Sequence, residues 1–135
     1  MPRNVIADSS ALVALVRHDD QHHRWLNAQI DALPRTWRTC EAALSEAFHL
    51  IGARGVPKIK EMLRRDAVVL SFDLGAELEP VLTLMDKYAD VPMSLADACL
   101  VRMSEILPDP VVLTTDADFK IYRRHSRQVV PCLLP

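Results

Sequence analysis

Short apolar runs alternate along the chain with longer segments in which apolar residues recur every three or four positions. The apolar runs predict strands at residues 5–7, 37–40, 67–72, 111–115 and 128–133. The segments between them predict helices over residues 9–16, around 25–30, and over 41–54, 57–63, 75–88 and 94–107, with a short basic helix after residue 116. Strands that alternate with helices favour an α/β fold, in which helices cover both faces of a parallel sheet.

Capping residues indicate where several of these helices begin and end. Ser9 and Ser10 supply N-cap chemistry for the first helix, and Ser94 does so for the last long one. Gly55 is the predicted C-cap of the helix over 41–54. We find no linker, repeat or low-complexity segment, so residues 1–135 are predicted to form one domain.

Two aspartates follow predicted strands directly. In open α/β sheets, functional groups gather at the carboxyl ends of strands beside the point where the strand order reverses. Asp8 and Asp116 occupy such positions. Each has an alternative interpretation, because an aspartate at a strand-to-helix junction often caps the helix or forms an Asx turn. For Asp8, the two serines that follow could do the capping instead.

Two further acids lie on predicted helices without a basic neighbour. Glu46 has no Lys or Arg three or four residues away, so the usual ion pair along a helix is missing. It is either a solvated side chain beside the apolar face or a carboxylate that binds a cation. Asp97 lies among small and apolar residues, where it could form a capping box with Ser94 or be held inside the fold.

Together the four acids predict a site for a hard divalent cation. Two carboxylates about 4 Å apart repel each other by about 4 kcal/mol at an effective dielectric constant near 20. Such a cluster holds protons at neutral pH unless a cation offsets its charge. Mg²⁺ prefers oxygen ligands and keeps several waters, so few direct carboxylates suffice. We therefore expect these acids to hold a divalent cation such as Mg²⁺.

Composition limits the cellular setting. Half of the 135 residues are hydrophobic and a quarter are charged, which is typical of a folded domain. The net charge of −2 counts mildly against nucleic acid as a ligand. Cys40, Cys99 and Cys132 have neither disulfide nor zinc spacing, which favours a reducing cytoplasm. Asp8 interrupts the apolar N-terminus, and no uncharged run is long enough to span a bilayer, so we expect neither a signal peptide nor membrane insertion.

Four segments in order resemble the PIN-domain family, and in particular the VapC-type toxins of bacterial toxin–antitoxin pairs. The segments are VIADSSAL at 5–12, LSEAFHL at 44–50, SLADA at 94–98 and LTTDADF at 113–119. The resemblance implies a three-layer α/β/α sandwich with a parallel sheet of order 3-2-1-4-5. It also implies Mg²⁺- or Mn²⁺-dependent endoribonuclease activity, a homodimer and inhibition by a small antitoxin.

The resemblance also implies roles for individual residues. The family's four acidic positions match Asp8, Glu46, Asp97 and Asp116, and its hydroxyl positions match Ser10 and Thr114. Asp118 matches a position that supports these ligands at most, and the spacing favours Glu46 over the nearby Glu41. Our hypothesis is that Asp8, Asp97 and Asp116 hold the metal, while Glu46 binds it or orients the attacking water.

Several basic and imidazole side chains remain. The run after Asp116 is predicted to be either a solvated helix face or a contact with the RNA backbone, through Lys120, Arg123, Arg124 and Arg127, with His125 among them. His18, His22 and His23 are expected on the solvated surface, with RNA contact as the second interpretation. His49 is expected to pack or to form a hydrogen bond beside Glu46.

Other functions stay open on the sequence alone. They are a related nuclease that acts in RNA processing or on DNA, and a non-catalytic binding module whose acids are structural. A small metal-dependent phosphatase is less favoured, because Ser10 stands where the haloacid-dehalogenase pattern needs a second aspartate.

Overall fold

The computed structural model describes residues 2–135, and a five-stranded parallel sheet lies at its centre. The sheet order is β3-β2-β1-β4-β7, and every neighbouring pair is parallel. The strands are β1 (Asn4–Ala7), β2 (Trp37–Thr39), β3 (Val68–Leu70), β4 (Pro110–Leu113) and β7 (Cys132–Leu133). With β7 as the fifth strand, the predicted order 3-2-1-4-5 is confirmed.

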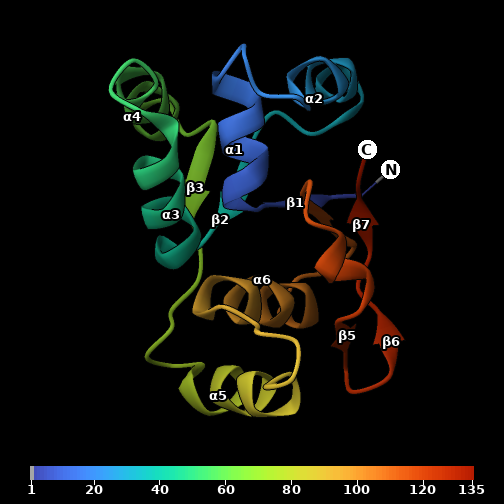
Figure 1. Cartoon of the computed structure of the whole chain (residues 1–135). Coiled ribbons are helices and arrows are strands. Elements are labelled where there is room, and N and C mark those ends of the chain that lie inside the picture. Colours follow the sequence, from blue (N-terminus) through green and yellow to red (C-terminus); the bar gives the residue numbers. More distant parts are fainter. Residues whose placement is uncertain (1) are drawn as a thin grey trace.

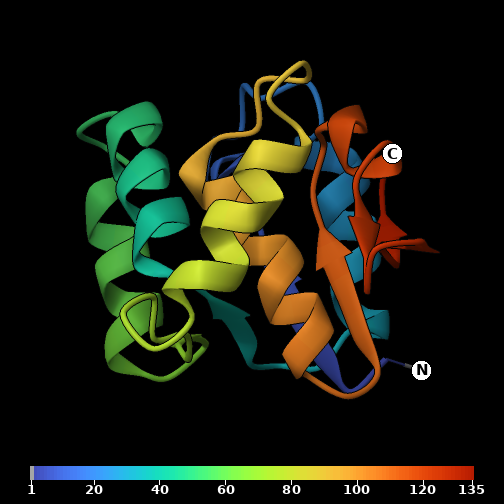
Figure 2. The same cartoon turned by 90° about the horizontal axis from the view of Figure 1, so that it is seen from below.

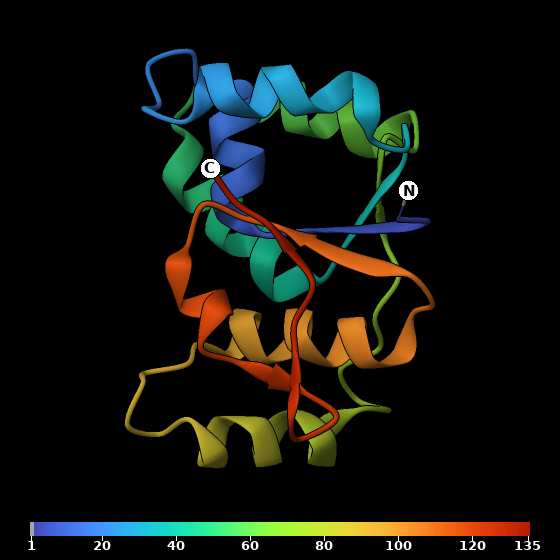
Figure 3. The same ribbon diagram turned by 90° about the vertical axis from the view of Figure 1, so that its right-hand side faces the viewer.

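The strand order reverses between β1 and β4. Ala7 at the end of β1 is paired with Leu113 at the end of β4. In Figure 3 both strands end on the left, where the first turn of α6 and the turn η2 (Ala117–Lys120) also lie. This edge of the sheet is therefore where side chains from several distant segments can meet.

Helices cover both faces of the sheet (Figure 1). On one face lie α1 (Ser9–Val16), α2 (His23–Gln29), η1 (Ile30–Ala32), α3 (Glu41–Ile51) and α4 (Val56–Arg64). On the other lies α6 (Leu95–Ile106), with α5 (Leu78–Lys87) packed outside it, as Figure 2 shows from below. Val5 and Ala7 of β1 pack into the hydrophobic core on the face covered by α1, and Ile6 packs into the core on the face covered by α6. This alternation follows from the two-residue period of a strand.

The helix α3 ends three residues earlier than the sequence predicted. It stops at Ile51, and Gly52 is its C-cap with φ of 76°, a left-handed conformation that glycine adopts at little cost. Gly55, the predicted cap, instead precedes α4. A Cβ at Gly55 would collide with the Ile51 side chain, so this glycine allows the two helices to approach closely.

Three other predicted elements differ from the structure. The strand over 67–72 is shortened to β3, an edge strand on which Leu70 is 47% exposed. The helix over 75–88 begins only at Leu78. The strand over 128–133 is divided at Pro131, which lacks an N–H for a continuous ladder, into β6 (Gln128–Val129) and β7.

The predicted basic helix after Asp116 was also wrong. The chain forms only the 3-10 turn η2 and then the strand β5 (Arg123–Arg124), which pairs antiparallel with β6. His125 and Ser126 turn the hairpin with φ of 49° and 69°. The hairpin forms because β5 pairs with β6, which lies in the segment over 128–133 that the sequence pattern predicted as a single strand.

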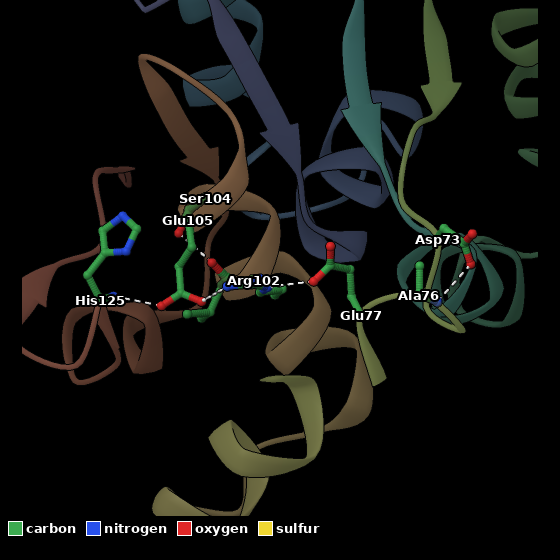
Figure 4. A network of polar contacts seen from close by, with 8 residues as sticks. Asp73, Ala76, Glu77, Arg102, Ser104, Glu105 and His125 are labelled. Carbon is green, nitrogen blue, oxygen red and sulfur yellow. Dashed lines mark hydrogen bonds and ion pairs between the residues drawn. The ribbon is translucent and has the colours of Figure 1, made fainter. Parts of the chain in front are cut away.

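A polar network fastens this hairpin to the helices beneath it (Figure 4). The Arg102 guanidinium on α6 donates to Glu77 at 2.9 Å and to Glu105 at 3.2 Å. Glu105 also accepts from the His125 backbone N–H at 2.6 Å. The Glu105 side chain is only 9% exposed and accepts from both Arg102 and the His125 backbone, so it links α6 to the turn of the hairpin.

Cys40 and Cys99 are buried, Cys132 is half-buried, and all three are free thiols. Over residues 2–135, no helix has the length and apolar character needed to cross a bilayer.

Candidate metal centre

Asp8 lies at the end of β1 and is held by four donors. Its Oδ1 accepts from the Ser9 backbone N–H at 2.7 Å and from the Ser9 hydroxyl at 3.4 Å. Its Oδ2 accepts from the hydroxyls of Ser10 at 3.1 Å and Thr114 at 2.7 Å. Asp8 is thus itself the N-cap of α1, and the prediction that Ser9 and Ser10 would do that work was wrong. Burial raises the pKa of Asp8, these hydrogen bonds oppose the shift, and the nearby charge of Asp116 adds to it.

Two hydroxyls connect the ends of β1 and β4. Thr114 donates to Asp8, and its Oγ1 accepts from the Asp116 backbone N–H at 2.9 Å. The Ser10 hydroxyl accepts from the Thr115 N–H at 3.0 Å and lies 3.2 Å from Thr114 Oγ1. These bonds place Asp116 beside Asp8, although 108 positions of sequence separate them (116 − 8).

Asp97 enters the same region from the first turn of α6. Its N–H donates to the Ser94 hydroxyl at 3.0 Å, which caps the helix as predicted. Its Oδ2 accepts a 2.8 Å hydrogen bond from the Tyr122 hydroxyl. Burial raises the pKa of Asp97 to about 6, and the charges of Asp8 and Asp116 contribute to the rise against the tyrosine hydrogen bond. The three aspartates therefore lie close enough to repel one another.

Glu46 is connected to this group through Ser9. It is half-buried on α3, and its Oε2 accepts from the Ser9 hydroxyl at 3.1 Å, the same hydroxyl that contacts Asp8. The sequence pattern had suggested Ser9 only as a helix cap. The contact depends on α1 and α3 packing side by side, so no local signal could have revealed it.

Asp116 and Asp118 are connected locally. Oδ1 of Asp116 accepts from the Asp118 N–H at 2.9 Å and so caps η2, which confirms the capping alternative for Asp116. Asp118 contributes this backbone donor and a nearby negative charge. Glu41, at the exposed start of α3, takes no part in these contacts.

The acids leave free oxygens for a ligand. Within the described residues, Oδ1 of Asp97, Oδ2 of Asp116 and Oε1 of Glu46 carry no hydrogen bond. Over residues 2–135, however, no three His, Cys, Asp or Glu side chains are arranged closely enough to surround a metal directly. The donor set therefore does not form a closed shell of the structural-zinc kind, whereas it fits a hard cation that keeps much of its water, as Mg²⁺ does.

The predicted RNA-binding residues differ in how available they are. Lys120 and Arg127 are exposed. The Arg123 guanidinium instead donates to the backbone carbonyls of Lys120 and Tyr122, at 2.8 and 3.0 Å. Arg124 is half-buried, and within residues 2–135 its Nε is buried without a hydrogen-bond partner. The four do not share a helix face, because the hairpin folds two of them inward.

The histidines lie apart from the acids in the hydrogen-bond network. His18 is exposed, and its ring stacks on that of His23 at 4.6 Å between centroids. His23 Nδ1 lies 2.7 Å from the Ala14 carbonyl oxygen, so this histidine has a structural contact. His49 is exposed, and the expectation that it would pack beside Glu46 was wrong.

Comparisons with known proteins agree with this arrangement. A model of the PIN domain matches residues 5–124. No curated protein sequence matches the chain. Among solved structures, the crystal structure of VapC20 from Mycobacterium tuberculosis, a toxin that cleaves the sarcin–ricin loop, has a TM-score of 0.78 at 17% identity, covering 87% of this chain and 94% of that one. At this identity the match establishes the fold, and the chemistry has to be argued from the residues.

Proposed function

The chain belongs to the PIN-domain family, and from this premise we propose that it is a metal-dependent endoribonuclease that hydrolyses RNA phosphodiester bonds. The observation that carries the proposal is the meeting of Asp8, Asp97 and Asp116 at one edge of the sheet. Burial and the charge of Asp116 raise the pKa of Asp8 there, and burial and the charges of Asp8 and Asp116 raise the pKa of Asp97. A bound cation would relieve this repulsion.

The residues divide the work between them. Asp8, Asp97 and Asp116 would hold Mg²⁺ or Mn²⁺, and Glu46 would bind the ion or orient the attacking water. When bound, such an ion lowers the pKa of a coordinated water and stabilises charge on the scissile phosphate.

The neighbouring side chains fix the acids in place. Thr114 and Ser10 orient Oδ2 of Asp8, and the Ser9 hydroxyl keeps Glu46 beside Asp8. The Asp118 N–H fixes one oxygen of Asp116 and leaves the other available. Lys120 and Arg127 are exposed and lie before and after the hairpin strand β5. They would contact the RNA backbone through charge-assisted hydrogen bonds to its phosphate oxygens.

We also propose a biological role, the toxin of a type II toxin–antitoxin system in the cytoplasm. The support is the fold that the chain shares with a VapC toxin over most of both chains. A small antitoxin protein would inhibit it, and the active form would be a homodimer.

Expression of the chain alone, and together with the product of its adjacent open reading frame, tests the role. A toxin arrests growth alone, is rescued by the neighbour, and leaves newly cut RNA ends that can be mapped. Asp97→Asn is the matched control, since it removes one carboxylate charge and keeps the shape of the side chain. A nuclease of RNA processing would cut without arresting growth, and a binding module would behave alike with and without Asp97→Asn.

Purified protein tests the chemistry. Labelled RNA should be cut in Mg²⁺ or Mn²⁺ and left intact in EDTA, while DNA of the same sequence should be spared. Equal cutting of RNA with and without EDTA would overturn the metal proposal, and preferential cutting of DNA would overturn the substrate.

A further inference from the structure

We propose that Tyr122 is a positioning residue of the candidate metal centre, and that its hydroxyl fixes the Asp97 carboxylate in the orientation that binds a divalent cation. The inference rests on the proposed function and adds a residue to it. Tyr122 lies between η2 and β5, within the basic run that the sequence analysis considered for RNA contact. No sequence pattern predicted a role for this tyrosine.

The contact is direct and buried. The Tyr122 hydroxyl donates to Oδ2 of Asp97 at 2.8 Å, and the tyrosine has no exposed surface. Within the described residues, Oδ1 of Asp97 carries no hydrogen bond. The tyrosine therefore holds one oxygen and leaves the other to a ligand.

The tyrosine ring is itself fixed from two sides. Phe119 meets it edge-to-face at 5.3 Å between centroids, and Tyr88 at the end of α5 does so at 5.2 Å. The Tyr88 hydroxyl accepts from the Arg123 backbone N–H at 2.7 Å, which ties the pair to the start of the hairpin. Edge-to-face packing of this kind restricts ring rotation, so the direction of the Tyr122 hydroxyl is set by the fold.

A buried tyrosine needs a hydrogen-bond partner, and a backbone carbonyl would satisfy it. The partner of the Tyr88 hydroxyl is a backbone N–H, whereas the partner of the Tyr122 hydroxyl is a carboxylate beside two other acids. Groups that hydrogen-bond to metal ligands orient them, and their loss typically weakens metal binding about tenfold or more. The two tyrosines thus form a natural pair, in which one touches the acids and the other does not.

The experiment compares Tyr122→Phe with Tyr88→Phe. Both remove one buried hydroxyl from the same aromatic cluster. Titration calorimetry with MnCl₂ in the absence of RNA gives the Kd for Mn²⁺, and thermal unfolding reports stability. We expect Tyr122→Phe to weaken Mn²⁺ binding about tenfold and Tyr88→Phe to leave it unchanged.

A double-mutant cycle guards against a purely structural effect. If Tyr122 acts through Asp97, then Tyr122→Phe has no further effect on Mn²⁺ affinity in the Asp97→Asn background. An unchanged Kd in Tyr122→Phe, or an equal loss in both tyrosine variants, would overturn the positioning role and leave the proposed function standing. A wild-type protein that binds no Mn²⁺ would overturn the metal-dependent function, and this inference with it.

Discussion

Thr114 donates a 2.7 Å hydrogen bond to Oδ2 of Asp8 across 106 positions of sequence. Both residues lie directly after strands that are neighbours in the sheet, where the strand order reverses. The same hydroxyl oxygen accepts from the Asp116 N–H, so one buried threonine sets the distance between two of the three aspartates.

Replacing this threonine tests its importance. Thr114→Val keeps the shape of the side chain and removes both hydrogen bonds, leaving a buried carboxylate short of a donor. We expect the free energy of unfolding to fall by about 1–3 kcal/mol in urea titrations, and kcat/KM for RNA cleavage to fall about ten- to a hundredfold. Thr83→Val, on the exposed side of α5, is the control. Similar effects of the two variants would show that the Thr114 contact is dispensable.

Asp97→Asn should separate catalysis from stability. The amide keeps an acceptor for Tyr122 and removes a charge that Asp8 and Asp116 oppose. Cleavage should be lost by about a hundredfold or more, while the Tm of the metal-free protein at pH 7.5 should stay equal or rise. Asp86→Asn, an exposed aspartate on α5, should change neither. A clear drop in Tm would mean that the Asp97 charge is structural.

The pH dependence follows from the direction of the Asp97 shift. The pKa of Asp97 is raised from 3.8 to about 6 in the folded state. The protonated carboxyl therefore stabilises the fold at a pH below the pKa of the unfolded chain, and this stabilisation is lost as the pH rises through the pKa of the folded state. The Tm of the metal-free protein should therefore decline between about pH 4 and pH 6. Asp97→Asn should reduce that decline. Equal declines in the two proteins would contradict the assignment.

Metal should reverse this trend. Because Mg²⁺ or Mn²⁺ competes with protons for the same carboxylates, the rise in Tm on adding metal should be larger at pH 7.5 than at pH 5. Differential scanning fluorimetry with and without EDTA measures it. A metal effect that is independent of pH would point to a site away from Asp8 and Asp97.

Salt dependence tests which basic residues reach RNA. For the Asp97→Asn protein and single-stranded RNA, the logarithm of the association constant should fall linearly with the logarithm of the salt concentration. Lys120→Ala or Arg127→Ala should each reduce the size of this slope by about 0.7, the value for one phosphate contact. Arg123→Ala should mainly lower stability, because its guanidinium binds backbone carbonyls. A slope that falls in Arg123→Ala but not in Lys120→Ala or Arg127→Ala would contradict this assignment.

Much of the fold followed from local patterns. The period of apolar residues identified β1, β2 and β4 and most helices, because burial on one face imposes that period wherever the element lies. The four acids were named from their position after strands or from the absence of a basic neighbour. Element ends were predicted less well: the sequence favoured Gly55 as the cap of α3, whereas the helix ends at Gly52, which has the positive φ, and Gly55 precedes α4.

The amino-acid sequence by itself determined which elements form and which carboxylates follow them, since both depend on residues within one or two turns. Tertiary structure alone decided that Ser9 joins Asp8 to Glu46 and that Tyr122 holds Asp97. Ser9 and Glu46 are 37 positions apart in sequence, and Asp97 and Tyr122 are 25 apart. Their geometry is set by how helices and strands pack, and packing leaves no periodic trace in the sequence.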